Sequence, residues 1–342
     1  MQREVSSYLK NKPARFSAKH DPQRITDWFE IERPLLTAER VAMHNRLDMK
    51  EFFRHPLKED IQSCIQKTQM YLLEEYGLKP KSFAFPQIFL VPSKSYQVLV
   101  SEISQDTDID YHNSQGMYNS GGIIYLRETE KSEDILHAVC HEWIHVLTTM
   151  RYKIQNIQNV PTFVPLLLGV RNFSGKQTFS AFNEALTEIT ALEALRYQKQ
   201  TINSIGYTSL VVFFEYLFTK IANEESTSVD EVRSKFISAN LQSDFSTLRI
   251  LKKYLDVRGI KTLCELTLQP TFDDLFKVFQ NNELARIDFA KYLLSLQQGG
   301  TILGNVPINL NLNKKQQSML TEVAMSRSRY HNFMKKIRRF FT

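Results

Sequence analysis

Two histidines four residues apart, with a glutamate directly after the first, most strongly limit how this chain can fold. His141, Glu142 and His145 lie in the stretch AVCHEWIHVL, residues 138–147. On an α-helix, residues i and i+4 are about 40° apart around the axis and about 6 Å apart along it. The two imidazoles would therefore project from one face and reach a single metal ion at about 2.0–2.1 Å. Glu142 would lie beside them, where its carboxylate can accept a proton from a water that the metal activates.

The alternative is an ordinary amphipathic helix with incidental histidines. The surrounding positions are strongly apolar, so the helix is expected to be buried, and burying two imidazoles and a carboxylate without partners costs several kcal/mol. A bound cation offsets that cost, which favours a metal site. His137 lies one turn earlier; a capping or surface role is preferred for it over a role as ligand. The apolar residues are Ile135, Leu136, Val139, Ile144, Val146 and Leu147.

A third ligand must come from elsewhere, because catalytic zinc sites usually have three protein ligands and one open position. No histidine follows at the H-E-x-x-H-x-x-G-x-x-H spacing. The stretch NEALTE, residues 183–188, offers carboxylates instead. Glu184 and Glu188 are i and i+4 on a second expected helix, where they would repel one another unless a positive group lies beside them. A solvated acidic helix face is the alternative.

Together the two motifs resemble the thermolysin-like gluzincin metallopeptidases, in which H-E-x-x-H is followed on a second helix by N-E-x-x-[ST]-[DE]. The resemblance covers roughly residues 120–195. It implies that Glu184 is the third ligand of one zinc ion, that Glu188 orients His141, and that Asn183 supports the other histidine. The 38 residues between His145 and Glu184 are a longer interval than thermolysin has.

The resemblance also implies an activity, the zinc-dependent hydrolysis of peptide bonds in peptide or protein substrates. Glu142 would act as general base and then pass its proton to the leaving amine. The group that stabilises the oxyanion is not assigned; Tyr254, Tyr330 and His331 are the candidates. Two alternatives stay open: a regulatory metallopeptidase or toxin that cleaves one specific partner protein, and a binding protein with a non-catalytic zinc.

The order of the expected elements, helices then strands then helices, favours an α+β fold. Strands are expected at 83–91, 95–101 and 117–128. The last would be an edge strand that pairs with an extended substrate in the family it resembles, and Gly121 and Gly122 either allow close approach or mark a bulge. Helices are expected at about 38–77, 132–150, 181–198 and repeatedly after 203, with an irregular segment at 151–178.

Three parts are expected along the chain. Residues 1–80 would form an N-terminal arm and helical segment. Residues 81–200 would form a zincin-like catalytic core, with a small mixed sheet and the active-site helix. Residues 201–342 would form a mostly α-helical C-terminal domain that ends in a basic helix.

The positive charge is concentrated at the C-terminal end. The net charge is +6, yet residues 314–342 alone contain eight basic residues and a single acid, Glu322, so the rest of the chain is close to neutral. A basic amphipathic helix near 315–340 could bind an anionic membrane or nucleic acid. Docking on the body of the protein with a solvated cationic face is the preferred interpretation.

The sequence favours a cytoplasmic protein without a transmembrane segment, although non-classical export stays open. The N-terminal residues contain no apolar h-region of a signal peptide. The apolar stretch at 160–170 is about half the length of a membrane span and contains two prolines. Three widely spaced cysteines without a C-x-x-C pair fit a reducing compartment.

Overall fold

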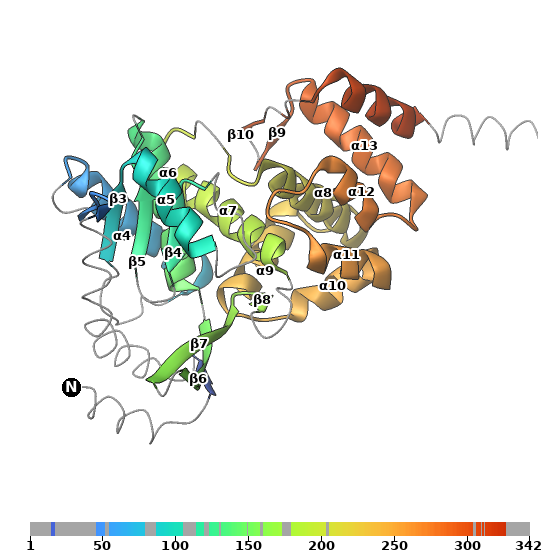
Figure 1. The fold of residues 1–342 in the computed structure, drawn as a ribbon. Coiled ribbons are helices and arrows are strands. Elements are labelled where there is room, and N and C mark those ends of the chain that lie inside the picture. The colour runs from blue at the N-terminus through green and yellow to red at the C-terminus, as the bar shows by residue number, and fades with distance from the viewer. Residues whose placement is uncertain are drawn as a thin grey trace, which may run out of the picture. The chain divides into compact units, whose positions relative to one another are not determined.

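The structure, a computed structural model, divides into two compact units (Figure 1). The first unit comprises Met1–Gly206 with Ser234–Phe245, and the second comprises Tyr207–Arg233 with Ser246–Thr342. The residues that it describes are 15–17, 46–51, 55–78, 87–104, 114–119, 123–129, 131–148, 150–157, 160–172, 179–202, 205–303, 306–308, 310 and 312–325.

A four-stranded mixed sheet in the order β2-β3-β5-β4 lies in the first unit. β2 (Lys50–Glu51) is antiparallel to β3 (Gln87–Val91), β3 is parallel to β5 (Ile123–Arg127), and β5 is antiparallel to β4 (Gly116–Asn119). The central strands β3 and β5 are buried at four of their five positions, as expected for strands covered on both faces. β4 is an edge strand within the described part of the chain.

Three helices of the first unit pack on one another: α4 (Lys58–Tyr76), α6 (Ser132–Leu147) and α7 (Ser180–Tyr197). α6 also contacts β4 and β5, so one helix joins the sheet to the other helices. Glu133 and Asp134 lie in its first turn, where acidic side chains favour helix formation. Fifteen residues of α7 are buried, which makes it the central helix of this unit.

A second sheet is ordered β1-β6-β7-β8, and all its strands except β1 follow α6 in the chain. The long hairpin of β6 (Met150–Ile157) and β7 (Val160–Leu168) pairs with β1 (Arg15–Ser17) on one side and with the short β8 (Arg171–Asn172) on the other. Gly169, in the turn between β7 and β8, has a φ of 56°, a left-handed conformation that favours glycine. The turn leads the chain back towards α7.

Helices dominate the second unit. A cluster of aromatic rings forms part of its core, with Phe289 in contact with Phe213, Tyr216, Phe276 and Phe279. The helices are α8 (Thr208–Glu225), α9 (Val229–Leu241, which continues into the first unit), α10 (Ser246–Tyr254), α11 (Val257–Glu265), α12 (Phe272–Val278) and α13 (Glu283–Gln297), followed by the strands β9 (Thr301–Ile302) and β10 (Val306–Pro307) and a helical stretch at 314–325.

The α+β class is confirmed, since a small mixed sheet accompanies a mostly helical chain. The helices expected at 132–150, at 181–198 and after 203 are also confirmed, at slightly different bounds. Gly77 caps α4 in the left-handed conformation, as expected. The division at residues 80 and 200 stays a prediction.

Four expectations about secondary structure are wrong. The strand expected at 95–101 is a helix, α5 (Ser93–Ser104), because Tyr96, Leu99 and Val100 are buried at helical spacing, which outweighs their β propensity. The strand expected at 117–128 is two antiparallel strands, β4 and β5. The segment 151–178, expected to be irregular, contains the β6–β7 hairpin. The helix expected at 38–77 is interrupted: among its described residues, β2 lies at Lys50–Glu51 and α4 begins at Lys58.

Some predictions lie outside the described residues. These include the glycines Gly121 and Gly122, and the end of the basic helix with Tyr330 and His331. None of the helices in the described part of the chain combines the length and apolar character needed to cross a membrane.

A buried ion pair stabilises the second unit. Glu215 of α8 and Arg233 of α9 are each only 4% exposed. The Nε and Nη2 atoms of Arg233 donate to the two carboxylate oxygens of Glu215, both at 2.8 Å. The Leu303 backbone N–H also approaches Oε2, at 3.4 Å. Such a pair offsets the cost of burying two charges only while both partners are present.

Replacement of Glu215 by alanine is expected to lower the free energy of unfolding by about 3–5 kcal/mol, because it removes the buried partner of the Arg233 guanidinium and leaves it with the exposed carboxylate of Asp230. Chemical denaturation measures the change. Glu224→Ala, in the same helix, removes an exposed i, i+4 pair with Lys220 and should cost less than about 0.5 kcal/mol. Equal losses of unfolding free energy in the two variants would contradict a special role for the buried Glu215–Arg233 pair.

Candidate metal centre

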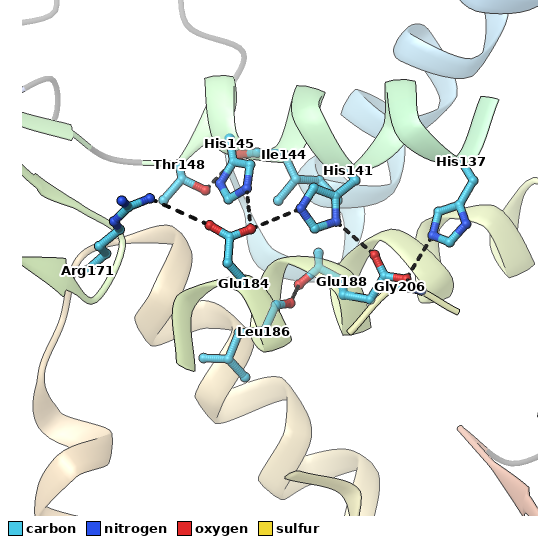
Figure 2. A network of polar contacts seen from close by, with 11 residues as sticks. His137, His141, Ile144, His145, Thr148, Arg171, Glu184, Leu186, Glu188 and Gly206 are labelled. Carbon is cyan, nitrogen blue, oxygen red and sulfur yellow. Dashed lines mark hydrogen bonds and ion pairs between the residues drawn. The ribbon is translucent and has the colours of Figure 1, made fainter. Parts of the chain in front are cut away.

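α6 and α7 lie side by side and direct their ionisable side chains towards one another (Figure 2). His137, His141 and His145 occupy successive turns of one face of α6, because they are four residues apart. Glu184 and Glu188 do the same on α7. Two independent i, i+4 patterns in the sequence therefore meet in space.

Three of these side chains converge on one point. The Nε2 atoms of His141 and His145 lie 3.2 Å and 3.1 Å from the same oxygen, Oε2 of Glu184. All three side chains are buried, and each offers a ligand atom within 4.8 Å of the others. This group could hold a metal ion, as its sequence spacing predicts.

The hydrogen bonds of His141 test whether a cation fits this group. Its Nδ1 atom lies 2.8 Å from Oε2 of Glu188, and an ionised carboxylate can only accept, so Nδ1 carries the hydrogen. In a neutral ring Nε2 then presents a lone pair towards Glu184 Oε2, which also carries lone pairs. Two such atoms 3.2 Å apart require a proton or a metal cation between them. The donor set therefore fits a metal ion.

The ionisation of the carboxylates also fits a cation site. Burial would raise the pKa of Glu184, but His145 and His141 outweigh it and hold that pKa well below its usual range. Burial likewise opposes ionisation of Glu188, and His137 with His141 still lowers its pKa. Burial would lower the pKa of His141, whereas Glu184 and Glu188 raise it well above its usual range. Glu184 is thus held as the anion that can bind a metal, whereas His141 must release the proton that its raised pKa favours before Nε2 can bind one.

Glu142 stands apart from the three candidate ligands. Its carboxyl is buried beside β4, and burial raises its pKa, while His141 and His145 act in the opposite direction. A hydrogen bond with the Tyr118 backbone also lowers that pKa. A Cβ atom at Gly116 would lie 2.9 Å from Glu142 Cγ, so the missing side chain of this glycine leaves room for the glutamate.

Of the two residues expected around the ligands, the structure places one against its histidine. Glu188 contacts His141 at 2.8 Å. Asn183 is fully buried but has no hydrogen bond with His145 among the described residues; its Oδ1 atom instead faces Gly169, close to Asn240. Asn240 in turn accepts from the Val170 N–H at 3.2 Å. Asn183 therefore lies against the turn between β7 and β8.

Sequence reasoning missed Arg171, on β8. Its guanidinium is buried, and Nη1 lies 3.9 Å from Oε1 of Glu184, the oxygen that does not face the histidines. A positive charge there favours the ionised form of the carboxylate. No periodic pattern in the sequence predicts this contact, because Arg171 lies on β8, the strand that follows the β6–β7 hairpin and pairs with β7. Tyr254, a candidate oxyanion donor, belongs to the second unit.

Comparisons with known proteins name no relative: no family model, no curated protein and no solved structure matches this chain. The resemblance to gluzincins therefore rests on the two sequence motifs and stays a prediction.

Glu184→Gln is expected to weaken metal binding by more than about 100-fold, because substitutions one layer further from a metal already cost about 10–100-fold. Metal content after dialysis and the dissociation constant for Zn²⁺ measure this. Glu193→Gln is the matched control on α7, since its carboxylate accepts hydrogen bonds from Tyr71 and Tyr76 instead. If Glu184→Gln retained the metal and Glu193→Gln lost it, the assignment of Glu184 as the ligand would be wrong.

Proposed function

We propose that this protein is a zinc-dependent peptidase, with His141, His145 and Glu184 as ligands of one Zn²⁺ ion and Glu142 as general base. The observation that carries the proposal is the approach of both Nε2 atoms to one oxygen of Glu184. Two imidazole nitrogens and one carboxylate oxygen are a donor set typical of catalytic zinc, which keeps a fourth position open.

The presence of Glu142 supports catalysis over a purely structural zinc. Structural sites are normally closed by four protein ligands, whereas the described residues offer a group of three. Glu142 projects about 100° around α6 from His141, so it lies beside the group without belonging to it. The opposing influences of His141, His145 and Glu184 on its pKa indicate that it is close to all three.

Zinc in such a site supplies Lewis acidity, which activates water and polarises a carbonyl. The chain supplies the proton transfers: the Glu142 carboxylate accepts the proton of the attacking water and gives it to the nitrogen of the leaving amine. Glu188 holds the hydrogen on Nδ1 of His141, which leaves Nε2 available as a ligand atom. Burial of the group limits competing water.

The edge strand β4 supports a peptide as the substrate. The Arg127 N–H donates to the Gln115 carbonyl, so in this antiparallel pair the main-chain groups of Gly116 and Tyr118 face away from β5. An extended peptide can add to such an edge by main-chain hydrogen bonds, here to Gly116 and to the Tyr118 carbonyl, because the Tyr118 N–H already bonds with Glu142. Gly116 is also the residue that touches Glu142, so a peptide on this edge would pass beside the general base.

A narrower activity, cleavage of one specific partner protein, is the second candidate. The β6–β7 hairpin lies in the chain between His145 and Glu184, and a protein substrate could contact it outside the scissile bond. A digest of a peptide library separates the two: broad cleavage supports a general peptidase, and cleavage of a single protein supports the narrower activity. Binding of the basic C-terminal segment to an anionic surface and a cytoplasmic location stay predictions.

Glu142→Gln is expected to retain Zn²⁺ and to lower kcat for peptide hydrolysis by about 10²–10⁴-fold, because an amide cannot accept the proton. Metal content and kcat are measured on the same preparation. A variant with intact activity would exclude Glu142 as the general base. A wild-type protein that binds zinc but hydrolyses no peptide or protein would favour a non-catalytic site.

Gly116→Ala is expected to lower kcat by about 10–100-fold with unchanged metal content, because its Cβ would displace the Glu142 side chain, and small displacements of a catalytic group have effects of this size. Gln115→Ala, at an exposed neighbouring position of the same segment, is the control and should leave kcat unchanged. Equal activity of both variants would mean that Glu142 does not depend on this contact.

A further inference from the structure

Glu188 is held by three groups, and only one of them is a metal ligand. Its carboxylate is 2% exposed. Oε2 accepts from Nδ1 of His141 at 2.8 Å, and Oε1 accepts from the backbone N–H of Gly206 at 2.6 Å. Nε2 of His137 also lies 2.9 Å from Oε1, a distance at which a protonated ring forms an ion pair, although the contact does not have the geometry of a hydrogen bond (Figure 2). Both oxygens are thus engaged on opposite sides of the carboxylate.

We propose that His137 is a positioning residue of the metal centre, which acts through Glu188 to fix the ring of His141 and thereby strengthens metal binding. The inference rests on the proposed zinc site. It assigns a role to a histidine whose preferred interpretation from the sequence was a capping or surface one.

The spacing of the side chains makes this role specific. Histidines of α6 and glutamates of α7 alternate in one row: His145, Glu184, His141, Glu188 and His137 (Figure 2). His137 is the outermost member, with a side chain that is 14% exposed against 8% for His141. It lies between the buried carboxylate and solvent.

The backbone at Gly206 lies directly against Glu188 and donates a hydrogen bond to it. A Cβ atom at this position would lie 3.0 Å from Oε1 and 3.2 Å from Cδ of Glu188. The backbone therefore approaches the carboxylate as closely as a glycine permits. Since this N–H already points at Oε1, the contact with His137 is better explained as support for the carboxylate than as half of a second metal site.

Metal binding would increase the dependence of Glu188 on His137. When Nε2 of His141 is a ligand, the ring is neutral and offers Glu188 only the Nδ1–H hydrogen bond. A buried carboxylate still needs compensation for its charge. His137 and the Gly206 N–H are the groups that supply it on the other oxygen. Loss of His137 would let the carboxylate turn, and the His141 ring would lose its orientation.

The test measures the dissociation constant for Zn²⁺ by competition with a chromophoric chelator, on the full chain. His137→Ala is expected to weaken binding about tenfold, at the lower end of the range for residues outside the ligand shell. His137→Gln, whose side-chain amide can donate a hydrogen bond to Oε1, should restore most of the affinity. His55→Ala removes a distant histidine that lies 3.7 Å from Glu128, and should have no effect.

A double-mutant cycle shows whether His137 acts through Glu188. His137→Ala should weaken binding much less in a Glu188→Gln background, because the group that it positions has lost its charge. The absorption spectrum of the Co²⁺-substituted protein should shift with His137→Ala and return with His137→Gln. Thermal unfolding of the metal-free variants separates this effect from general destabilisation.

Two results would overturn the inference: an unchanged dissociation constant in His137→Ala, or additive effects in the cycle. Neither result would contradict the peptidase proposal, which depends on hydrolysis and on Glu142. Conversely, zinc affinity that follows the expected pattern in a protein without hydrolytic activity would support His137 and reject the peptidase. A wild-type protein without zinc affinity would reject both.

Discussion

The burial of two carboxylates and two imidazoles between α6 and α7 is the constraint on which the rest of the site depends. Each ionised carboxylate in an apolar interior needs a positive or hydrogen-bonding partner, and each oxygen of Glu188 and the inner oxygen of Glu184 has one. The helices can pack closely only with these side chains in register. The packing of α6 against α7 therefore also brings the side chains of the site together.

α6 combines these roles because its faces point in different directions. The face that carries His141 and His145 meets α7, whereas Glu142, about 100° around the axis, meets the edge strand. One helix thus relates the candidate ligands to the edge strand β4. Gly116 matters for the same reason, since any larger residue would push the strand and Glu142 apart.

Local periodicity in the sequence predicts which side chains share a helix face. It does not predict contacts between residues that are far apart in the chain. His141, His145, Glu184 and Glu188 could be identified because i, i+4 spacing on a helix fixes their common face. Residues 95–101 were misassigned as a strand, since aromatic and β-branched residues also fit a helix when Tyr96, Leu99 and Val100 are its buried face. The β6–β7 hairpin was missed because Pro161 and Pro165 suggested an irregular segment. Gly116, Arg171 and Gly206 carry no pattern at all; their contacts with Glu142, Glu184 and Glu188 exist only in three dimensions.

Gly206 extends this argument beyond the two helices. It is the last residue of the first unit before the chain enters α8, and its N–H is the shortest contact that Glu188 makes. The orientation of His141 is therefore linked, through one carboxylate, to the path of the backbone where it leaves the unit. A cation bound to His141 would fix Glu188 more firmly, and so does the contact with His137. Either effect also restrains the backbone at Gly206, which bonds to the same carboxylate. Because such coupling is reciprocal, a well-placed chain at residues 205–206 would in turn favour the metal-binding arrangement of α6 and α7.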